Sequence, residues 1–186
     1  MPVAAHENCK PLFIPQRLFE EHVKELGEYN RLRVEEHGWE PRRPTVVCWV
    51  YCHEDAGQAE ADARRYLTEY GDSALRHYQL LDNHFEHLKG YEYYAQMSQA
   101  RANMPEGTDT AVIYLENNVW GTPEQCLEKL EAINNLMGAD EFVAVFSYGS
   151  MPFEKAEASM RLFAERVLPK ARSFSPAEIP LLVGAP

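Results

Sequence analysis

The sequence predicts an α/β fold in which parallel strands alternate with flanking helices, and three observations indicate it. Segments with apolar residues at helical spacing alternate with short, almost wholly apolar segments. The two strongest apolar segments, Thr45 to Cys52 and Phe142 to Phe146, are typical of strands that are covered on both faces. The length of 186 residues is enough for one substantial core. We therefore expect a piece of a parallel α/β architecture.

The charge balance excludes two classes of partner. The formal net charge of -11 repels the phosphates of nucleic acids and of anionic membranes. No stretch approaches the roughly 18 apolar residues of a membrane span, and the first seven residues lack the basic and apolar regions of a signal peptide. We expect no nucleic-acid partner, no membrane partner and, by default, a cytoplasmic location.

The cysteines and histidines do not follow a metal-binding pattern. The cysteines are Cys9, Cys48, Cys52 and Cys126. They include no Cys-x-x-Cys pair, so we expect reduced thiols and neither a disulfide framework nor a zinc site. His84 and His87 lie three residues apart, but no ligand of clear spacing accompanies them, so a solvated face is the simpler interpretation. We predict no metal site.

The N-terminal part is predicted to be a strand remnant followed by a helix. The first 14 residues hold a brief apolar start with prolines within or beside it, which indicates a short strand leading into a loop. From about 16 to 37, apolar residues recur at helical spacing: Phe19, Val23, Leu26, Tyr29 and Leu32. Gly38 is placed to end this helix as a left-handed cap.

The middle of the chain is predicted to hold one strand and helix unit and a long insertion. Thr45 to Cys52 is the strand, and Asp55 can cap a helix from about 56 to 70, with a second helical stretch that continues to about 81. Residues 82–118 are predicted as short helices and an excursion from the core. Insertions of this size are often lids or binding loops.

The C-terminal part is predicted to be a helix, strand, helix unit. Thr122 can cap the first helix, Pro123 needs no amide donor in its first turn, and Gln125 stands where a capping-box partner belongs. Phe142 to Phe146 follows as a buried strand, and a helix with an apolar face runs to about 172. We expect one domain over residues 1–173 and a proline-rich tail over 174–186, either an extended surface strap or a frayed end.

Three motifs together carry a resemblance to a known family. They are Trp-Gly-Thr-Pro-Glu-Gln-Cys at 120–126, Phe-Ser-Tyr-Gly at 146–149, and Ala-Ser-Met-Arg-Leu-Phe-Ala-Glu-Arg-Val-Leu-Pro at 158–169. In order and separation they resemble the bacterial luciferase-like flavin-dependent monooxygenases, from Met1 to about Arg172. The resemblance implies a partial TIM (β/α)8 barrel, its C-terminal half, with residues 1–3, 46–52 and 142–146 near the sixth, seventh and eighth strands. A complete barrel needs about 250 residues.

The resemblance also implies chemistry and partners. It implies oxidation of a small organic substrate by O2 and reduced flavin, with FMN as the cofactor and the deazaflavin F420 as the alternative, supplied by a flavin reductase. The family's active-site histidine and most flavin phosphate contacts belong to the first half, so no residue here is assigned a catalytic role. A sheet of two or three strands has open edges, so we expect a homo-oligomer, a missing barrel half or marginal stability.

Candidate site residues follow from the ends of the strands. His53 and Tyr148 occupy carboxyl ends, where such barrels build their sites, and Gly149 would let a flavin or substrate approach bare backbone. Each also has a plain structural interpretation as part of a strand end or turn. Three tyrosines, Tyr91, Tyr93 and Tyr94, lie in the segment that resembles the family's mobile loop and form a candidate lid, with ordinary packing as the alternative. A non-catalytic subunit that binds a flavin-like ligand, or pairs with another half barrel, is the alternative function.

Overall fold

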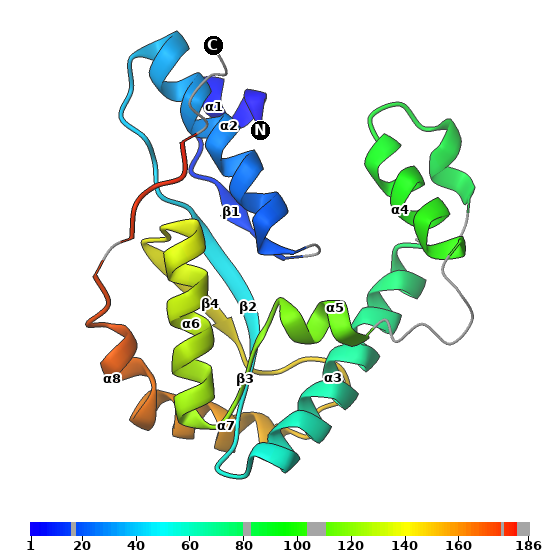
Figure 1. The fold of residues 1–186 in the computed structure, drawn as a ribbon. Coiled ribbons are helices and arrows are strands. Elements are labelled where there is room, and N and C mark those ends of the chain that lie inside the picture. Colours follow the sequence, from blue (N-terminus) through cyan, green and yellow to red (C-terminus); the bar gives the residue numbers. More distant parts are fainter. Residues whose placement is uncertain (16–17, 80–82, 104–110, 176, 182–186) are drawn as a thin grey trace.

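A computed structural model describes residues 1–15, 18–79, 83–103, 111–175 and 177–181 (Figure 1). Over these residues the chain forms a four-stranded parallel sheet with helices on both faces. In chain order, the elements are α1 (Pro2–His6), β1 (Leu12–Phe13), α2 (Phe19–His37), β2 (Thr45–Cys52), α3 (Ala56–His77), the 3-10 helix η1 (Asn83–His87), α4 (Glu92–Ala102), α5 (Ala111–Glu116), β3 (Val119–Gly121), α6 (Pro123–Met137), β4 (Glu141–Val145), α7 (Phe153–Arg166) and α8 (Leu168–Ala171).

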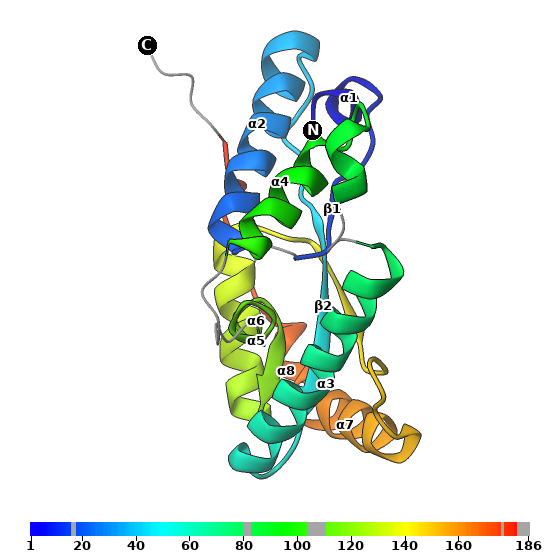
Figure 2. The same ribbon diagram turned by 90° about the vertical axis from the view of Figure 1, so that its right-hand side faces the viewer.

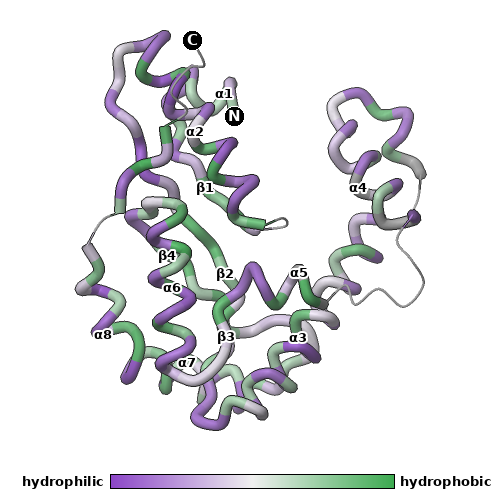
Figure 3. Tube along the Cα trace, in the orientation of Figure 1, coloured by the Kyte–Doolittle hydropathy of each residue, from purple (hydrophilic) through white to green (hydrophobic). Residues whose placement is uncertain are grey.

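Strand β2 is the centre of the sheet, because each of the other three strands pairs with it in parallel. Strand β1 pairs with its first two residues, β3 with Val50 to Cys52, and β4 with Thr45 to Trp49. All eight residues of β2 are buried, and much of the strand is coloured as hydrophobic in Figure 3. The predicted α/β class with parallel strands is confirmed.

Alternate residues of β2 face two separate apolar clusters. Val46, Cys48, Val50 and Cys52 pack against α2 and α6, whereas Trp49 and Tyr51 pack against α3 and α5. This division follows from the period of two in a strand, whose successive side chains point to opposite faces. The apolar strand is therefore covered on both sides, as its composition predicts.

The predicted helix ends are confirmed at three positions. Gly38 ends α2 in the left-handed conformation, with φ of 66°. Asp55 caps α3 through a hydrogen bond that its carboxylate accepts from the Gln58 amide at 2.7 Å. Thr122 and Gln125 form a reciprocal capping box at the start of α6. Each signal is local, because the cap and its partner lie within about four residues of each other.

Two predicted elements are wrong and one strand was not predicted. The chain start is helix α1 and not a strand; the short strand is Leu12–Phe13. The predicted break near residue 70 is absent, because α3 continues without interruption to His77. The unpredicted strand is β3, which occupies the residues just before the capping box of α6.

Strand β4 is less buried than expected. It spans Glu141–Val145, one residue earlier than predicted at each end, and Val143 is 44% exposed. Among the described residues β4 pairs only with β2, and its Phe142 and Ala144 line a cavity under the helices. One edge of this strand therefore has no neighbour in the described part of the chain.

The segment at 177–181 packs back onto the first half of the chain. The Arg43 guanidinium donates to the carbonyls of Ala177 and Gly138, at 2.7 and 2.8 Å. The buried Asn30 side chain donates to the Pro180 carbonyl at 3.3 Å. In these contacts with the segment, a side chain of the first half binds a backbone carbonyl of the segment. The position of the segment therefore depends on its backbone more than on its own side chains.

Candidate functional site at the carboxyl end of strand β2

A pocket of about 510 Å³ lies at the carboxyl end of β2, beside the first turns of α7. The lining residues are Tyr51, Cys52, His53, Glu54, Glu154, Lys155, Ala158, Ser159 and Leu162. Ser159 anchors the two elements, because its hydroxyl accepts a hydrogen bond from the Cys52 amide at 2.8 Å. In parallel α/β folds the carboxyl ends of the strands are where sites are built, so this pocket is the candidate site.

His53 is fixed at the rim of this pocket through both its backbone and its ring. Its amide donates to the Gly121 carbonyl at 3.0 Å, which pins the residue to the end of β3. Its Nδ1 lies 3.0 Å from the amide nitrogen of Asp55, which can only donate, and 3.3 Å from the carbonyl oxygen of Asp55, which can only accept. The shorter contact favours the tautomer with the proton on Nε2, in which that nitrogen is the hydrogen-bond donor.

A buried carboxylate, that of Asp62, lies behind the pocket and binds two of its lining residues, Tyr51 and Lys155. Asp62 Oδ2 accepts hydrogen bonds from the Tyr51 hydroxyl at 2.8 Å, from Gln58 at 2.9 Å and from Lys155 Nζ at 2.5 Å. Burial alone would raise the pKa of Asp62, but hydrogen bonds from Lys155, Gln58 and Tyr51 outweigh it and lower the pKa. Burial, and then the hydrogen bond to Asp62, raises the pKa of Tyr51. Asp62 is therefore the charged member of this network and Tyr51 stays a neutral donor.

Tyr51 connects the network to His53. The two rings are nearly parallel, with an interplanar angle of 9° and centroids 6.4 Å apart. Tyr51 cannot rotate away without breaking its bond to Asp62. The aromatic wall of the pocket is thus held by a polar network behind it, which favours a preformed site.

Tyr148 and Gly149 lie elsewhere. Tyr148 packs with Trp49 in the apolar cluster under α3, and its buried hydroxyl has no hydrogen-bond partner among the described residues. Burial raises the pKa of Tyr148. Gly149 has φ of 60°, and a Cβ there would lie 2.6 Å from the Tyr66 carbonyl oxygen. Close packing on α3 therefore accounts for the glycine, and neither residue lines the pocket of His53.

The three candidate lid tyrosines pack with one another and with Phe85. The Phe85 and Tyr91 rings stack at 5.6 Å and 14°, and Tyr94 lies within 5.4 to 6.0 Å of Phe85, Tyr91 and Tyr93. In both Figure 1 and Figure 2, α4 stands level with α1 and α2, whereas the carboxyl end of β2 lies at the opposite end, near α7. The tyrosines thus do not cover the pocket, and their role as a lid stays a prediction that this arrangement does not support.

The length of α3 explains this displacement. A helix of 22 residues is about 33 Å long, so it carries the excursion from one end of β2 toward the other. A helix that ended at residue 70 would have left the excursion nearer the pocket.

Sequence reasoning missed Asp62, Lys155 and Ser159 as site residues. Asp62 and Lys155 are 93 positions apart, and each looks like an ordinary polar residue on a helix. The one local signal is that Asp62 falls on the face of α3 that also carries the buried Ala59, Ala63 and Tyr66. A carboxylate on a buried face needs a partner, and this could have marked it.

A second cavity, of about 500 Å³, lies between α6, α8 and β4. It is lined mainly by apolar residues of the helical layer, together with Arg43 and Arg172. It reaches the start of β4 at Asp140 and Glu141, opposite to the strand ends that carry His53. We therefore treat it as a packing gap in the helical layer and not as the candidate site.

No helix in the described ranges has the length and apolar character that crossing a membrane requires.

No curated protein matches the chain in sequence. Several solved structures share the fold, among them the following three. Monooxygenase RslO1 from Streptomyces bottropensis superposes with a TM-score of 0.56 and 22% identity, covering 91% of this chain and 44% of that chain. The oxygenating constituent of 3,6-diketocamphane monooxygenase from Pseudomonas putida, a type II Baeyer-Villiger monooxygenase in complex with FMN, has a TM-score of 0.54 and 18% identity, covering 97% of this chain and 46% of that chain.

The third structure, apo-MsnO8, has a TM-score of 0.54 and 18% identity, covering 94% of this chain and 48% of that chain. The chain therefore spans about half the length of these luciferase-like TIM-barrel proteins. The sequence profile of the luciferase-like monooxygenases matches residues 4–141. Because that match covers most of the sequence, the chain belongs to the luciferase-like monooxygenase family.

Proposed function

We propose that the chain is part of a flavin-dependent monooxygenase. In this enzyme, reduced flavin and O2 oxidise a small organic substrate at the pocket of His53. The observation that carries the proposal is this pocket, which stands at the carboxyl end of the central strand of a family member. FMN is the proposed cofactor, since one structure with the same fold holds it, and the deazaflavin F420 is the second candidate.

The residues of the pocket suit the flat ring of a flavin better than its phosphate. His53 offers an aromatic face, which lies parallel to the ring of the buried Tyr51, and Ala158 and Leu162 add apolar surface. The charged lining is less suited to an anion, because Lys155 is already paired with Asp62 and the carboxylates of Glu54 and Glu154 repel a phosphate. The family resemblance assigns most phosphate contacts to the first half of the barrel, so we propose that this pocket holds the flavin ring and not its phosphate.

Each residue then has a defined task toward the ring. His53 donates a hydrogen bond from Nε2, Tyr51 supports the His53 face, and Ala158 and Leu162 exclude water. When bound, a reduced flavin supplies the electrons that activate O2. A flavin reductase is the proposed source of the reduced cofactor.

The test is a titration of the purified chain with FMN, riboflavin and F420, oxidised and reduced, followed by flavin fluorescence. We expect FMN and riboflavin to bind with similar affinity, because the ring is the part recognised here. His53→Ala should weaken binding at least tenfold, whereas His77→Ala, which removes an exposed histidine from the end of α3, should not. Absence of binding at millimolar flavin, or equal loss in both variants, would refute a flavin site at His53. A screen of small organic substrates with reduced flavin and O2 then tests turnover.

A second candidate function is a non-catalytic subunit that pairs with another half barrel. The observation that favours it is β4, which pairs only with β2 among the described residues and leaves Val143 44% exposed. Such a subunit would form a homodimer or a heteromer through this edge. Light scattering tests this second candidate function: a strictly monomeric, well-folded chain would contradict it. A dimer that the charged variant Val143→Lys dissociates would support it.

A further inference from the structure

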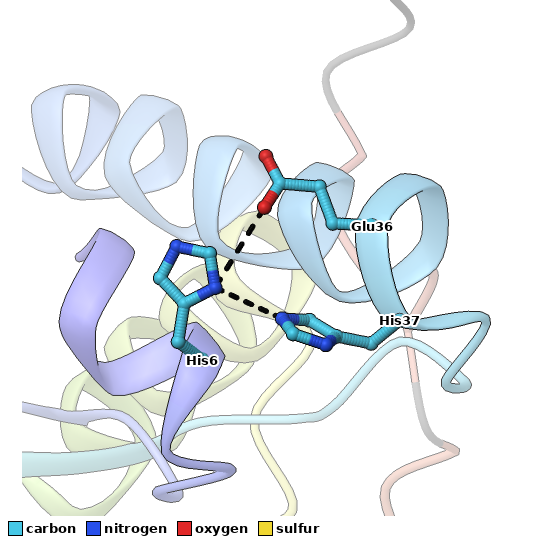
Figure 4. Close-up of side chains that lie close together, drawn as sticks. All are labelled: His6, Glu36 and His37. Atoms are coloured by element: carbon cyan, nitrogen blue, oxygen red, sulfur yellow. Dashed lines mark hydrogen bonds and ion pairs between the residues drawn. The ribbon is translucent and has the colours of Figure 1, made fainter.

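Three side chains with metal-ligating atoms meet where α1 packs on the end of α2 (Figure 4). His6 Nδ1 lies 2.9 Å from His37 Nε2 and 3.7 Å from Glu36 Oε2. The ligand atoms all lie within 4.8 Å of one another, and the His6 and Glu36 side chains are 45% and 47% exposed. A solvated ion can therefore reach all three.

The backbone that carries these residues is fixed by other interactions. Just after α1, the Asn8 side chain accepts a hydrogen bond from Arg33 at 2.6 Å, and the Asn8 carbonyl accepts one from Arg42 at 2.8 Å. On α2, the His37 ring stacks on Trp39 with centroids 4.3 Å apart at 14°. The cluster is therefore held in place by contacts that do not use its own ligand atoms, which lowers the entropy cost of binding an ion.

The spacing of the ligand atoms is close to that of a tetrahedral zinc site. Zn–N bonds of about 2.0 to 2.1 Å require ligand atoms about 3.3 Å apart. The nitrogens of His6 and His37 need to separate by a few tenths of an ångström. The Glu36 carboxylate lies within 4.8 Å of both nitrogens and needs to approach them, and rotation of this side chain, which is 47% exposed, can close the distance. Without an ion, the N–H of one imidazole donates a hydrogen bond to the unprotonated ring nitrogen of the other.

The local electrostatics also favour a cation. The cluster stands at the carboxyl end of a helix of 19 residues, where the helix dipole is negative. The chain as a whole carries a net charge of -11. Two imidazoles and one carboxylate are ligands that suit Zn²⁺, and three protein ligands leave one position for water.

We propose that His6, Glu36 and His37 form a site for a divalent transition metal, with Zn²⁺ as the preferred ion, which fastens helix α1 to the end of α2. The role is structural, because α2 leads to the start of β2 whereas His53 follows the end of that strand. The site is thus separate from the proposed flavin pocket. Sequence reasoning could not find it, because His6 and His37 are 31 positions apart.

The test uses untagged full-length protein treated with a chelator and titrated with Zn²⁺ alone by calorimetry. We expect one Zn²⁺ per chain, an affinity loss of more than about tenfold in His6→Ala and in His37→Ala, and a smaller loss in Glu36→Gln. The matched control is His77→Ala, which removes a histidine from the last turn of α3, as His37 is in the last turn of α2. Circular dichroism checks that each variant is folded.

Co²⁺ provides a second readout, because a tetrahedral site of nitrogen and oxygen ligands gives it visible absorption bands. We expect these bands in the wild type and in His77→Ala, and their loss in His6→Ala and His37→Ala. Zn²⁺ should also raise Tm in the wild type and in His77→Ala, but not in His6→Ala or His37→Ala. The proposal is overturned if the wild type binds no Zn²⁺, or if the ligand variants bind as tightly as the control; the latter would mean an adventitious ion only.

Discussion

Asp62 and Lys155 join the helices that follow β2 and β4 through an ion pair of 2.5 Å. The Asp62 side chain is 9% exposed and that of Lys155 is 40% exposed, so the pair lies at the boundary between core and pocket. The same oxygen of Asp62 accepts hydrogen bonds from Tyr51 and Gln58. One carboxylate thus links the central strand, α3 and α7.

The first prediction concerns this carboxylate. Asp62→Asn should lower the free energy of unfolding at pH 7 by about 1 to 3 kcal/mol, because it weakens three hydrogen bonds to a buried oxygen. The pKa of Asp62 is lowered in the folded state, so its contribution is present above the ordinary value of 3.8 and disappears as pH falls through the lowered pKa. Urea unfolding from pH 7 to pH 2.5 should therefore show a shallower acid loss in Asp62→Asn than in the wild type.

A control for this prediction is available on α7. Glu157 pairs with Arg161 on the surface of that helix, so Glu157→Gln should change stability by less than about 0.5 kcal/mol. Equal effects of Asp62→Asn and Glu157→Gln would contradict the special role of Asp62.

The second prediction concerns Gly149, whose left-handed backbone and close approach to Tyr66 are separable effects. Gly149→Ala should destabilise by at least about 1 kcal/mol more than Gly38→Ala, because the added methyl group meets the Tyr66 carbonyl. Gly38 has a similar φ of 66° with nothing within 4 Å of a Cβ, so its substitution reports backbone strain alone, about 1 kcal/mol. Thermal and urea unfolding measure both. Equal losses would mean that the packing on α3 relaxes without cost.

The third prediction is a pH dependence that arises from Lys129. Its ammonium lies 3.4 Å from the centroid of the Trp120 ring, and burial lowers its pKa to about 8. Between this value and the ordinary 10.5, the unfolded chain binds a proton that the folded chain does not, so stability conferred through Lys129 rises with pH across that range.

Comparison with Lys129→Met isolates this effect. The difference in unfolding free energy, wild type minus variant, should increase from pH 8 to pH 10, as measured by urea unfolding. The exposed Lys89 supplies the control, since Lys89→Met should leave the slope of the wild type unchanged. Parallel curves for the wild type and Lys129→Met would refute the lowered pKa.

The helix ends and the apolar strand could be predicted because their determinants are close in sequence. Thr122 and Gln125 bind each other across one turn, and β2 is apolar at almost every position. The break expected near residue 70 was wrong for a long-range reason. Gly71 stays helical, and a Cβ there would lie 2.5 Å from the Tyr114 ring, so this glycine makes room for α5 and does not end α3.

The candidate site could be predicted only in part for the same reason. A strand end marks His53, but its partners in the pocket come from α7, and the carboxylate that binds Tyr51 and Lys155 comes from α3. The sequence does not show which residues of these two distant helices meet. How far β4 is exposed depends on how closely α6 and α8 pack against it. The apolar character of the segment alone therefore could not predict that β4 is only partly buried.

The fourth prediction tests the return of the C-terminal segment over Gly138. A chain truncated after residue 176 loses the carbonyls that Arg43 and Asn30 bind, and we expect it to be less stable by about 1 to 3 kcal/mol. Gly138→Ala should also destabilise the full chain, since φ there is 58° and a Cβ would lie 2.5 Å from the Glu178 carbonyl oxygen.

The two changes should couple, because the truncated chain has no Glu178 for the new methyl group to meet. In a double-mutant cycle measured by urea unfolding, Gly138→Ala should therefore cost less in the truncated chain than in the full chain, by about 0.5 to 3 kcal/mol. Gly38→Ala provides the comparison, because its φ is similar but nothing lies within 4 Å of a Cβ there. Its cost should be the same in both chains. An additive cycle for Gly138→Ala would mean that residues 177–181 do not pack over Gly138 in solution.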